Sequence, residues 1–312
     1  MSRIHDALKK AELEKAAGAG AETGARSAGL PEPEAARGEG VPGVMLESPA
    51  TPALGAGEGR SGQITLETLL ARCSRPPWSP KPEGLVFLDS PRPALGAEEF
   101  RTLRSRLYLV RQKQPLQTLL ITSALPLEGK TFVAANLAHV FVQQQECRAL
   151  LIDADLRWSR LHLLLGAPLA PGLSEYLQGK ADEFSILQRG PQGNLFFIAG
   201  GQSAAYPAEL IANGRFKGLL QRLAPVFDWI VIDSPPAIPV SDASLLAELC
   251  DGMLMVVQAG TTPFDLAQKV CEGFRTKRLL GVVLNRAAPR SGYGSYYYGG
   301  YGEDGGKGKR RR

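Results

Sequence analysis

The sequence predicts an α/β domain built on a mainly parallel β-sheet that is flanked by helices. Short runs of Val, Ile and Leu recur from residue 118 onward, and they alternate with segments of helix length. Unbroken apolar runs are typical of strands buried on both faces, and their alternation with helices is typical of a parallel sheet. The predicted strands lie within residues 118–124, 148–155, 194–200, 229–235, 252–260 and 279–285.

Composition narrows the classes of protein that the chain can belong to. Its 312 residues, 44% of them hydrophobic, suffice for one large domain with appendages. The formal net charge of +5 is mild, and no helix-turn-helix accompanies it, so we expect no nucleic-acid partner. The four cysteines have no metal or disulfide spacing. No stretch has the length of a membrane span and no secretory signal is evident, so we expect a cytoplasmic protein.

The N-terminal part of the chain predicts an attached helix rather than core. Residues 1–17 have helical periodicity, with Ile4, Leu8 and Leu13 near one face, and form either a docking helix or a frayed end. Residues 18–84 are rich in Ala, Gly, Pro and Glu, which predicts a disordered linker, with a short helix within residues 64–73. The main domain is therefore predicted at residues 85–290.

A phosphate loop is predicted directly after the first strand. The sequence ALPLEGKT at residues 124–131 follows that strand and opens a helix, whose N-terminus attracts anions. Ala124 stands at the first glycine of the usual pattern. Lys130 is predicted to neutralise β/γ phosphate oxygens, and Thr131 to ligate Mg²⁺. The residues predicted to contact ATP here are Ala124, Pro126, Glu128, Gly129, Lys130, Thr131 and Phe132.

Three acidic residues are predicted beside this loop. Asp153, Asp155 and Asp233 follow buried strands, at the edge where parallel sheets bind ligands. Each alone fits a helix cap, but together they predict a hydrated Mg²⁺ site, with Asp155 and Asp233 on the metal side. Asp153 is our preferred general base, although the sequence does not separate its role from that of Asp155. Arg157 is either a phosphate contact or a surface charge.

Asn285 ends the last predicted strand, at residues 279–285. Its side chain is equally consistent with a hydrogen bond to the adenine edge of ATP and with a turn after the strand.

The C-terminal segment, residues 291–312, concentrates tyrosines where no core can form. Five of the eight tyrosines lie there among Gly, Ser and charged residues, which predicts a flexible tail whose aromatic rings are free to enter an active site. The predicted phosphate acceptors are Tyr293, Tyr296, Tyr297, Tyr298 and Tyr301.

The motifs together resemble those of the bacterial tyrosine kinases of the CpsD/CapB type. TSALPLEGKT, LLIDADLR and VIDSPP are similar to the Walker A, A′ and B motifs of that family. GAEEFRTLRSRL is similar to its Glu-x-x-Arg-x-x-Arg helix, and the tyrosine tail to its autophosphorylation cluster. MSRIHDALKKAE resembles the start of stand-alone members encoded with exopolysaccharide systems. Within these motifs, Leu127 stands at a usual glycine, and Trp158 and Ser159 at a usual Arg-Pro pair.

The resemblance implies a MinD/ParA-like P-loop fold and a protein-tyrosine autokinase that uses ATP and Mg²⁺. It also implies regulation of exopolysaccharide synthesis, export and chain length. The expected partners are a membrane chain-length regulator that activates the kinase and recruits it to the inner membrane, and a cognate tyrosine phosphatase. Glu98, Arg101 and Arg104 are expected to join copies of the chain into an oligomer such as a ring, or else to form an ion-pair ladder within the helix.

Two other functions fit the same fold. One is a MinD/ParA-like regulatory ATPase, but that group carries a lysine early in the phosphate loop, where this chain has Leu125. The other is a non-catalytic scaffold of a polysaccharide export complex. The regulatory ATPase predicts no phosphotyrosine on the chain, and the scaffold predicts little.

Overall fold

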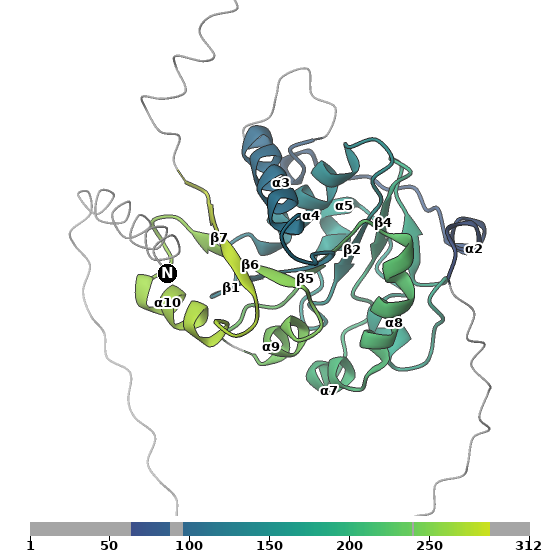
Figure 1. The fold of residues 1–312 in the computed structure, drawn as a ribbon. Coiled ribbons are helices and arrows are strands. Elements are labelled where there is room, and N and C mark those ends of the chain that lie inside the picture. The colour runs from purple at the N-terminus through teal and green to yellow at the C-terminus, as the bar shows by residue number, and fades with distance from the viewer. Residues whose placement is uncertain (1–63, 88–95, 239, 288–312) are drawn as a thin grey trace, which may run out of the picture.

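The computed structural model describes residues 64–87, 96–238 and 240–287 (Figure 1). Three predicted features lie wholly or mostly outside these residues: the docking helix at 1–17, the larger part of the linker, and the tyrosine tail. Within the described residues, no helix is long and apolar enough to cross a membrane.

One mainly parallel sheet forms the centre of the molecule, in the order β3-β4-β2-β5-β1-β6-β7. Its strands are β1 (Thr118–Ser123), β2 (Ala149–Asp153), β3 (Leu187–Arg189), β4 (Leu195–Ile198), β5 (Trp229–Asp233), β6 (Gly252–Gln258) and β7 (Leu279–Asn285). The six predicted strands are confirmed. The seventh, β3, is antiparallel and only three residues long, too short for an apolar run to reveal it.

Helices cover both faces of the sheet (Figure 1). On one face lie α3 (Ala97–Arg111), α4 (Lys130–Val142) and α5 (Leu161–Leu165). On the other face lie α6 (Leu173–Leu177), α7 (Pro207–Ala212), α8 (Arg215–Leu223), α9 (Asp242–Ala247) and α10 (Phe264–Gly273), with the short turn η2 (Ala224–Val226) after α8. Alternate side chains of β1 pack on opposite faces of the sheet: Leu120 packs on the face that carries α8, and Leu119 and Ile121 pack on the face that carries α4. Both faces of the strand are therefore buried, as the unbroken apolar run predicts.

The predicted linker boundary at residue 84 is wrong. The segment before it forms α2 (Leu66–Arg72) and the turn η1 (Pro82–Gly84), and Leu69 in α2 is only 1% exposed. Ser74 pairs with Gln188 of β3, and the Trp78 ring meets Phe197 edge-on. These apolar side chains are widely spaced among prolines and polar residues. The short helix predicted within residues 64–73 is confirmed as α2, but the contacts that join the segment to the domain are long-range and have no local sequence signal.

The parallel register brings the ends of the central strands together. β2 pairs with β5 so that Asp153 lies opposite Asp233, and both strands end there. β1 lies on the other side of β5 and leads into the phosphate loop. The carboxyl ends of three neighbouring strands thus form one edge, the usual ligand site of an open α/β sheet.

Candidate active site

The phosphate loop, residues 124–131, connects β1 to the first turn of α4. Its backbone is left-handed at Leu127, with φ 66°, and at Gly129, with φ 93°. Gly129 caps α4 without any side-chain hydrogen bond to the first turn. The amides of that turn remain available, and with the helix dipole they form a site for anions. The predicted strand–loop–helix arrangement is confirmed.

Leu127 keeps the left-handed conformation that a glycine would adopt more easily. A branched side chain in this region costs about 1 kcal/mol relative to glycine. The side chain is 77% exposed, so no packing within the described chain offsets that cost. The loop therefore retains its turn without the glycine that the family resemblance leads one to expect.

Lys130 begins α4 and points toward the acidic edge of the sheet. Its Nζ lies 3.3 Å from Asp155 Oδ2. Burial by itself lowers the pKa of Lys130, but the charges of Asp233 and Asp155 outweigh burial, and the net pKa is raised. The side chain is therefore a fixed cation beside the phosphate loop.

Thr131 and Asp233 join the loop to the end of β5. The Thr131 hydroxyl donates to Asp233 Oδ2 at 2.7 Å, while Asp233 Oδ1 is buried without a hydrogen-bond partner. Burial raises the pKa of Asp233 to about 7, with Lys130 opposing the shift and Asp153 adding to it. A buried carboxylate oxygen that lacks a partner is costly unless a ligand completes its coordination.

These groups fit a hydrated Mg²⁺ ion rather than a metal held by protein side chains alone. Among the described residues, no three His, Cys, Asp or Glu side chains are arranged as a ready metal cluster. Mg²⁺ usually keeps several waters and takes one or two protein oxygens together with phosphate oxygens. The Thr131 hydroxyl and the free Oδ1 of Asp233 suit that coordination.

Asp153 and Asp155 have different surroundings, and the difference argues against Asp153 as the base. Asp153 is fully buried, and its Oδ2 accepts from Ser159 Oγ at 2.7 Å and from the amides of Arg160 and Leu161 at 3.1 Å. Burial raises its pKa to about 6, while the Ser159 and Leu161 hydrogen bonds oppose the shift. These hydrogen bonds hold the following loop, and Oδ1 accepts from the Asp155 amide at 3.2 Å, so both oxygens of the carboxylate are engaged within the chain. Asp155, paired with Lys130, is the better candidate.

Glu128 braces the phosphate loop from inside. Its side chain is only 3% exposed; Oε2 accepts from the Leu125 amide at 2.7 Å, and Oε1 accepts from the Thr262 hydroxyl. Thr262 also accepts from the Gln258 amide at the end of β6. The Glu128 side chain therefore has a structural role, and an ATP contact of this residue can come only from its backbone. The partner Thr262 lies more than a hundred residues away and has no local sequence signal.

Asn285 also contacts the phosphate loop. It forms the predicted turn after the strand and, in addition, a hydrogen bond to the loop that the sequence does not predict. Its Nδ2 donates to the Glu128 carbonyl at 2.9 Å, and its Oδ1 accepts from the Arg286 amide at 2.9 Å. The second bond belongs to a turn, with Arg286 at φ 56°. A Cβ at Gly129 would collide with the Asn285 amide. The side chain thus lies against the loop backbone, which is evidence against the predicted adenine contact.

The remaining predicted ATP contacts have side chains directed elsewhere. Arg157 pairs with the buried Asp242, with Nε 2.8 Å from Oδ2 and Nη2 3.1 Å from Oδ1, so its guanidinium is not directed to a phosphate. The Phe132 ring packs against Phe100. Ala124 is fully buried, and Pro126 is exposed beside it. Ala124, Pro126 and Phe132 can contact a nucleotide only through their backbone or at the loop surface.

The three residues expected to join subunits are partly engaged within the chain. Arg101 forms an ion pair with Glu98 along α3 at 3.0 Å, which agrees with the ladder alternative. Arg104 donates to the Val140 carbonyl at 2.8 Å and so ties α3 to α4. Glu98 keeps a side chain that is 65% exposed. Arg104 has a structural role in the single chain, while Glu98 and Arg101 remain accessible.

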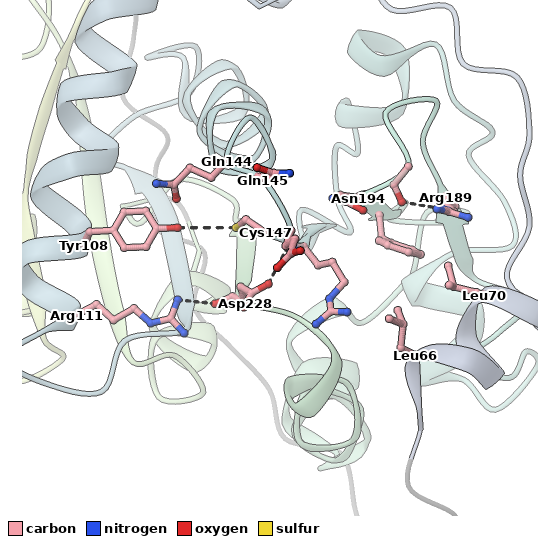
Figure 2. A pocket seen from close by; sticks show the side chains of 14 residues that line it. Leu66, Leu70, Tyr108, Arg111, Gln144, Gln145, Cys147, Arg189, Asn194 and Asp228 are labelled. Carbon is pink, nitrogen blue, oxygen red and sulfur yellow. Dashed lines mark hydrogen bonds between the residues drawn. The ribbon is translucent and has the colours of Figure 1, made fainter.

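A pocket of about 1000 Å³ lies away from this site. Cys147 and Arg148 precede β2, Asn194 precedes β4 and Asp228 precedes β5, so the pocket is at the amino edge of the sheet. Figure 2 shows Tyr108 and Arg111 on one side of it and Arg189 on the other. Lys130 and the phosphate loop are not part of its lining. The chemistry of the carboxyl edge identifies the candidate active site better than the size of this pocket does.

The fold and the site together define a P-loop nucleotide-binding α/β protein. No family model matches the chain. Tyrosine-protein kinase YwqD of Bacillus subtilis (strain 168) is 34% identical over 219 residues, which make up 69% of this chain and 91% of that protein. Tyrosine-protein kinase etk of Escherichia coli (strain K12) is 33% identical over 206 residues, 66% of this chain and 28% of that protein.

Solved structures give the same result. The kinase domain of Escherichia coli tyrosine kinase ETK is 31% identical with a TM-score of 0.58, over 65% of this chain and 80% of that chain. The chimerical protein CapA2B2 is 29% identical with a TM-score of 0.63, over 67% of this chain and 92% of that chain. The chain belongs to the family of bacterial tyrosine-protein kinases and is therefore a protein-tyrosine kinase. Membership of this family favours a tyrosine kinase over the MinD/ParA-like regulatory ATPase as the function of the chain.

Proposed function

We propose that the chain is an autokinase that transfers the γ-phosphoryl group of ATP, with Mg²⁺, to the tyrosines of its own C-terminal segment. The observation that supports this most strongly is the pairing at the carboxyl edge: Lys130 with Asp155 at 3.3 Å and Thr131 with Asp233 at 2.7 Å. A phosphate loop with a fixed cation and a metal-binding acid supplies the positioning and charge neutralisation that phosphoryl transfer needs. The Gly-flanked tyrosines supply an accessible acceptor.

Lys130 would exchange partners when nucleotide binds. In the described structure it neutralises Asp155, and γ-phosphate oxygens are a stronger attraction because they carry more charge. Asp155 is then free to accept the phenol proton of an incoming tyrosine. The phenol oxygen attacks the γ-phosphorus, the bond to the bridging oxygen breaks, and ADP leaves. Mg²⁺ held by Thr131 and Asp233 supplies charge neutralisation for the phosphate oxygens.

Membership of the family also supports a biological setting. We propose that the kinase acts in exopolysaccharide synthesis and export, that a membrane chain-length regulator activates it and recruits it to the inner membrane, and that a tyrosine phosphatase reverses its phosphorylation.

Copies of the chain would assemble through the exposed Glu98 and Arg101 of α3, so that each tail enters the site of a neighbour. Each phosphotyrosine adds about −1.5 to −2 charges, so phosphorylation would loosen the assembly.

Anti-phosphotyrosine blotting of the purified full chain with ATP, with and without Mg²⁺, tests the proposed activity. The wild-type chain should be labelled only with both ligands, and Lys130→Met should not be labelled. Lys217→Met, an exposed lysine on α8, is the matched control and should be labelled normally. Undiminished labelling of Lys130→Met would contradict the proposed site. No labelling of any protein would favour the scaffold function.

Light scattering before and after incubation with MgATP tests the proposed assembly. The unphosphorylated chain should be larger than a monomer, and phosphorylation should lower its mass. Glu98→Lys should dissociate it without affecting folding, because that side chain is 65% exposed. A monomer at all concentrations with full autophosphorylation would rule out the proposed neighbour-to-neighbour reaction.

A further inference from the structure

Three exposed apolar side chains lie on loops that leave the carboxyl edge of the sheet, the edge to which Lys130 points. Leu127, in the phosphate loop, is 77% exposed; Trp158, after β2, is 70% exposed; and Ile238, after β5, is 43% exposed. Soluble proteins usually expose such residues singly, and several around one functional site indicate a binding surface. We call these three residues the apolar rim.

Hydrogen bonds keep two members of the apolar rim close to the reacting groups. The Trp158 amide donates to Asp155 Oδ1 at 3.1 Å, and the other oxygen of Asp155 is paired with Lys130. The Ile238 amide donates to the Ala124 carbonyl at 3.3 Å, at the start of the phosphate loop. The backbone of Trp158 is thus one hydrogen bond away from the carboxylate that we assign as the base.

The Trp158 ring is held on one side and accessible otherwise. The Arg160 guanidinium lies over the ring, 5.7 Å from its centroid, in a cation–π contact. The other two tryptophans of the chain are less accessible: Trp229 is fully buried, and Trp78 is partly buried against Phe197. An exposed indole on a residue whose backbone amide contacts the Asp155 carboxylate offers a platform on which an aromatic ring can stack.

The acceptor sequence makes such a platform useful. In GSYYYGGYG, residues 294–302, the neighbours of the tyrosines are Gly, Ser and other tyrosines. No charged or aliphatic side chain is available within this stretch for an enzyme to recognise. Selection of such a substrate must depend on the tyrosine ring and the backbone. An aromatic platform recognises the ring without requiring any particular neighbour.

We propose that Trp158 is a substrate-specificity residue whose indole stacks on the acceptor tyrosine of the Gly-flanked C-terminal segment and places its hydroxyl beside Asp155. Leu127 and Ile238 complete the apolar surroundings of the ring. This inference rests on the proposed function, because it assumes that the tail is the substrate. It goes beyond that function by assigning how the acceptor is recognised.

The test uses the full chain with its five tail tyrosines changed to alanine, and the synthetic peptide GSYYYGGYG as the only acceptor. Trp158→Ala should raise the KM for the peptide about 2- to 10-fold, the size of an aromatic pair, and leave the KM for ATP within about 2-fold. Trp158→Phe keeps a ring and should restore most of the peptide affinity. Tyr206→Ala, which removes an aromatic that is 71% exposed at the start of α7, should change neither constant.

Tryptophan fluorescence provides a readout that does not depend on activity. Titration with the same peptide carrying Phe for Tyr should change the emission of the chain, and a peptide with Leu for Tyr should have little effect. The change should disappear in Trp158→Phe, because Trp229 is fully buried and Trp78 is partly buried against Phe197, away from the carboxyl edge. This titration detects ring binding even if the chain transfers no phosphate.

Several results would overturn the inference. These are an unchanged peptide KM in Trp158→Ala, a raised KM for ATP instead, and a change of oligomeric state with unchanged peptide affinity. In those cases the indole would be idle, or would belong to the nucleotide site or to a subunit contact. Failure of the proposed function looks different: no phosphotyrosine would form in any variant, and the fluorescence titration would still decide whether Trp158 binds a tyrosine ring.

Discussion

The two edges of the sheet use carboxylates in opposite ways, partly buried at the amino edge and buried at the carboxyl edge. At the amino edge, Asp251 Oδ2 accepts from the amides of Gln117 and Thr118 at 2.9 and 2.8 Å, and Asp228 accepts from the Arg148 amide at 2.8 Å. These acids complete the hydrogen bonds of backbone that enters the strands. At the carboxyl edge, Asp233 keeps an oxygen without a partner, and Asp155 is neutralised by a lysine.

The comparison shows which buried acids belong to the chemistry. A carboxylate whose hydrogen bonds are completed by backbone amides stabilises the fold. A carboxylate with an unmet acceptor, or paired with a cation that a ligand can attract away, is prepared for a ligand. Asp153 lies at the carboxyl edge but has the hydrogen bonding of the amino-edge acids, and so we assign it a structural role.

The largest expected effect comes from exchanging acid for amide at each edge. Asp233→Asn should lower the phosphorylation rate about 10²- to 10³-fold, because it removes a charge that neutralises the metal. Asp251→Asn should leave the rate per folded molecule unchanged but lower the free energy of unfolding by about 1–3 kcal/mol, since its hydrogen bonds to backbone amides are charge-assisted. Initial rates and urea unfolding of both variants measure this. Equal loss of rate in both would break the distinction between the edges.

Asp233→Asn and the wild-type chain should differ in how stability depends on pH. In the folded, metal-free protein the pKa of Asp233 is raised from 3.8 to about 7, so folding favours its protonated form. That contribution is complete below pH 3.8 and is lost as the pH rises toward 7. Asp233→Asn should therefore gain stability over wild type as the pH rises through this range. Unfolding in EDTA measures it, and a pH-independent difference would show that Asp233 is not desolvated.

Asn285→Ala should have a smaller effect, on the conformation of the phosphate loop. Loss of the hydrogen bond to the Glu128 carbonyl removes about 1 kcal/mol, so ATP affinity should fall about 2- to 10-fold. A residue that only braces the loop cannot distinguish bases, and GTP affinity should fall by the same factor. Calorimetric titration with both nucleotides tests this. A selective loss of ATP binding would return Asn285 to the adenine contact.

Leu127→Gly should have the smallest effect on folding. Glycine relieves the left-handed backbone at φ 66° but increases the entropy of the unfolded chain, so the two terms largely cancel. The free energy of unfolding should change by less than about 1 kcal/mol, as urea denaturation would measure. A larger loss would mean that the exposed side chain packs on a part of the chain outside the described residues.

Local patterns in the sequence were sufficient to predict the sheet and the loop. The apolar runs predict six of the seven strands, and the GKT sequence places Lys130 and Thr131 at the start of a helix. The strand-end acids are also correctly brought together at one edge. These features depend on neighbours in the sequence or on the rule that parallel strands end at the same edge.

The errors concern contacts between distant parts of the chain. Arg157 pairs with Asp242, and Glu128 accepts from Thr262. In both pairs the two residues lie far apart in the sequence and share no motif. Ser159 and two amides decide the role of Asp153, a distinction that two aspartates in one motif do not reveal. The sequence predicts the helix within residues 64–73 but not its packing on the domain, because composition alone assigns the segment at 64–84 to a linker.

Intact-mass spectrometry after incubation with MgATP tests the division between the two edges most directly. Lys130→Met removes the cation of the carboxyl edge, and Arg148→Met removes a cation that lines the pocket at the amino edge. Wild type and Arg148→Met should gain up to five phosphoryl groups, one for each tail tyrosine, and Lys130→Met should gain none. Phosphorylation of Lys130→Met, or its loss in a folded Arg148→Met protein, would contradict our assignment of the active site.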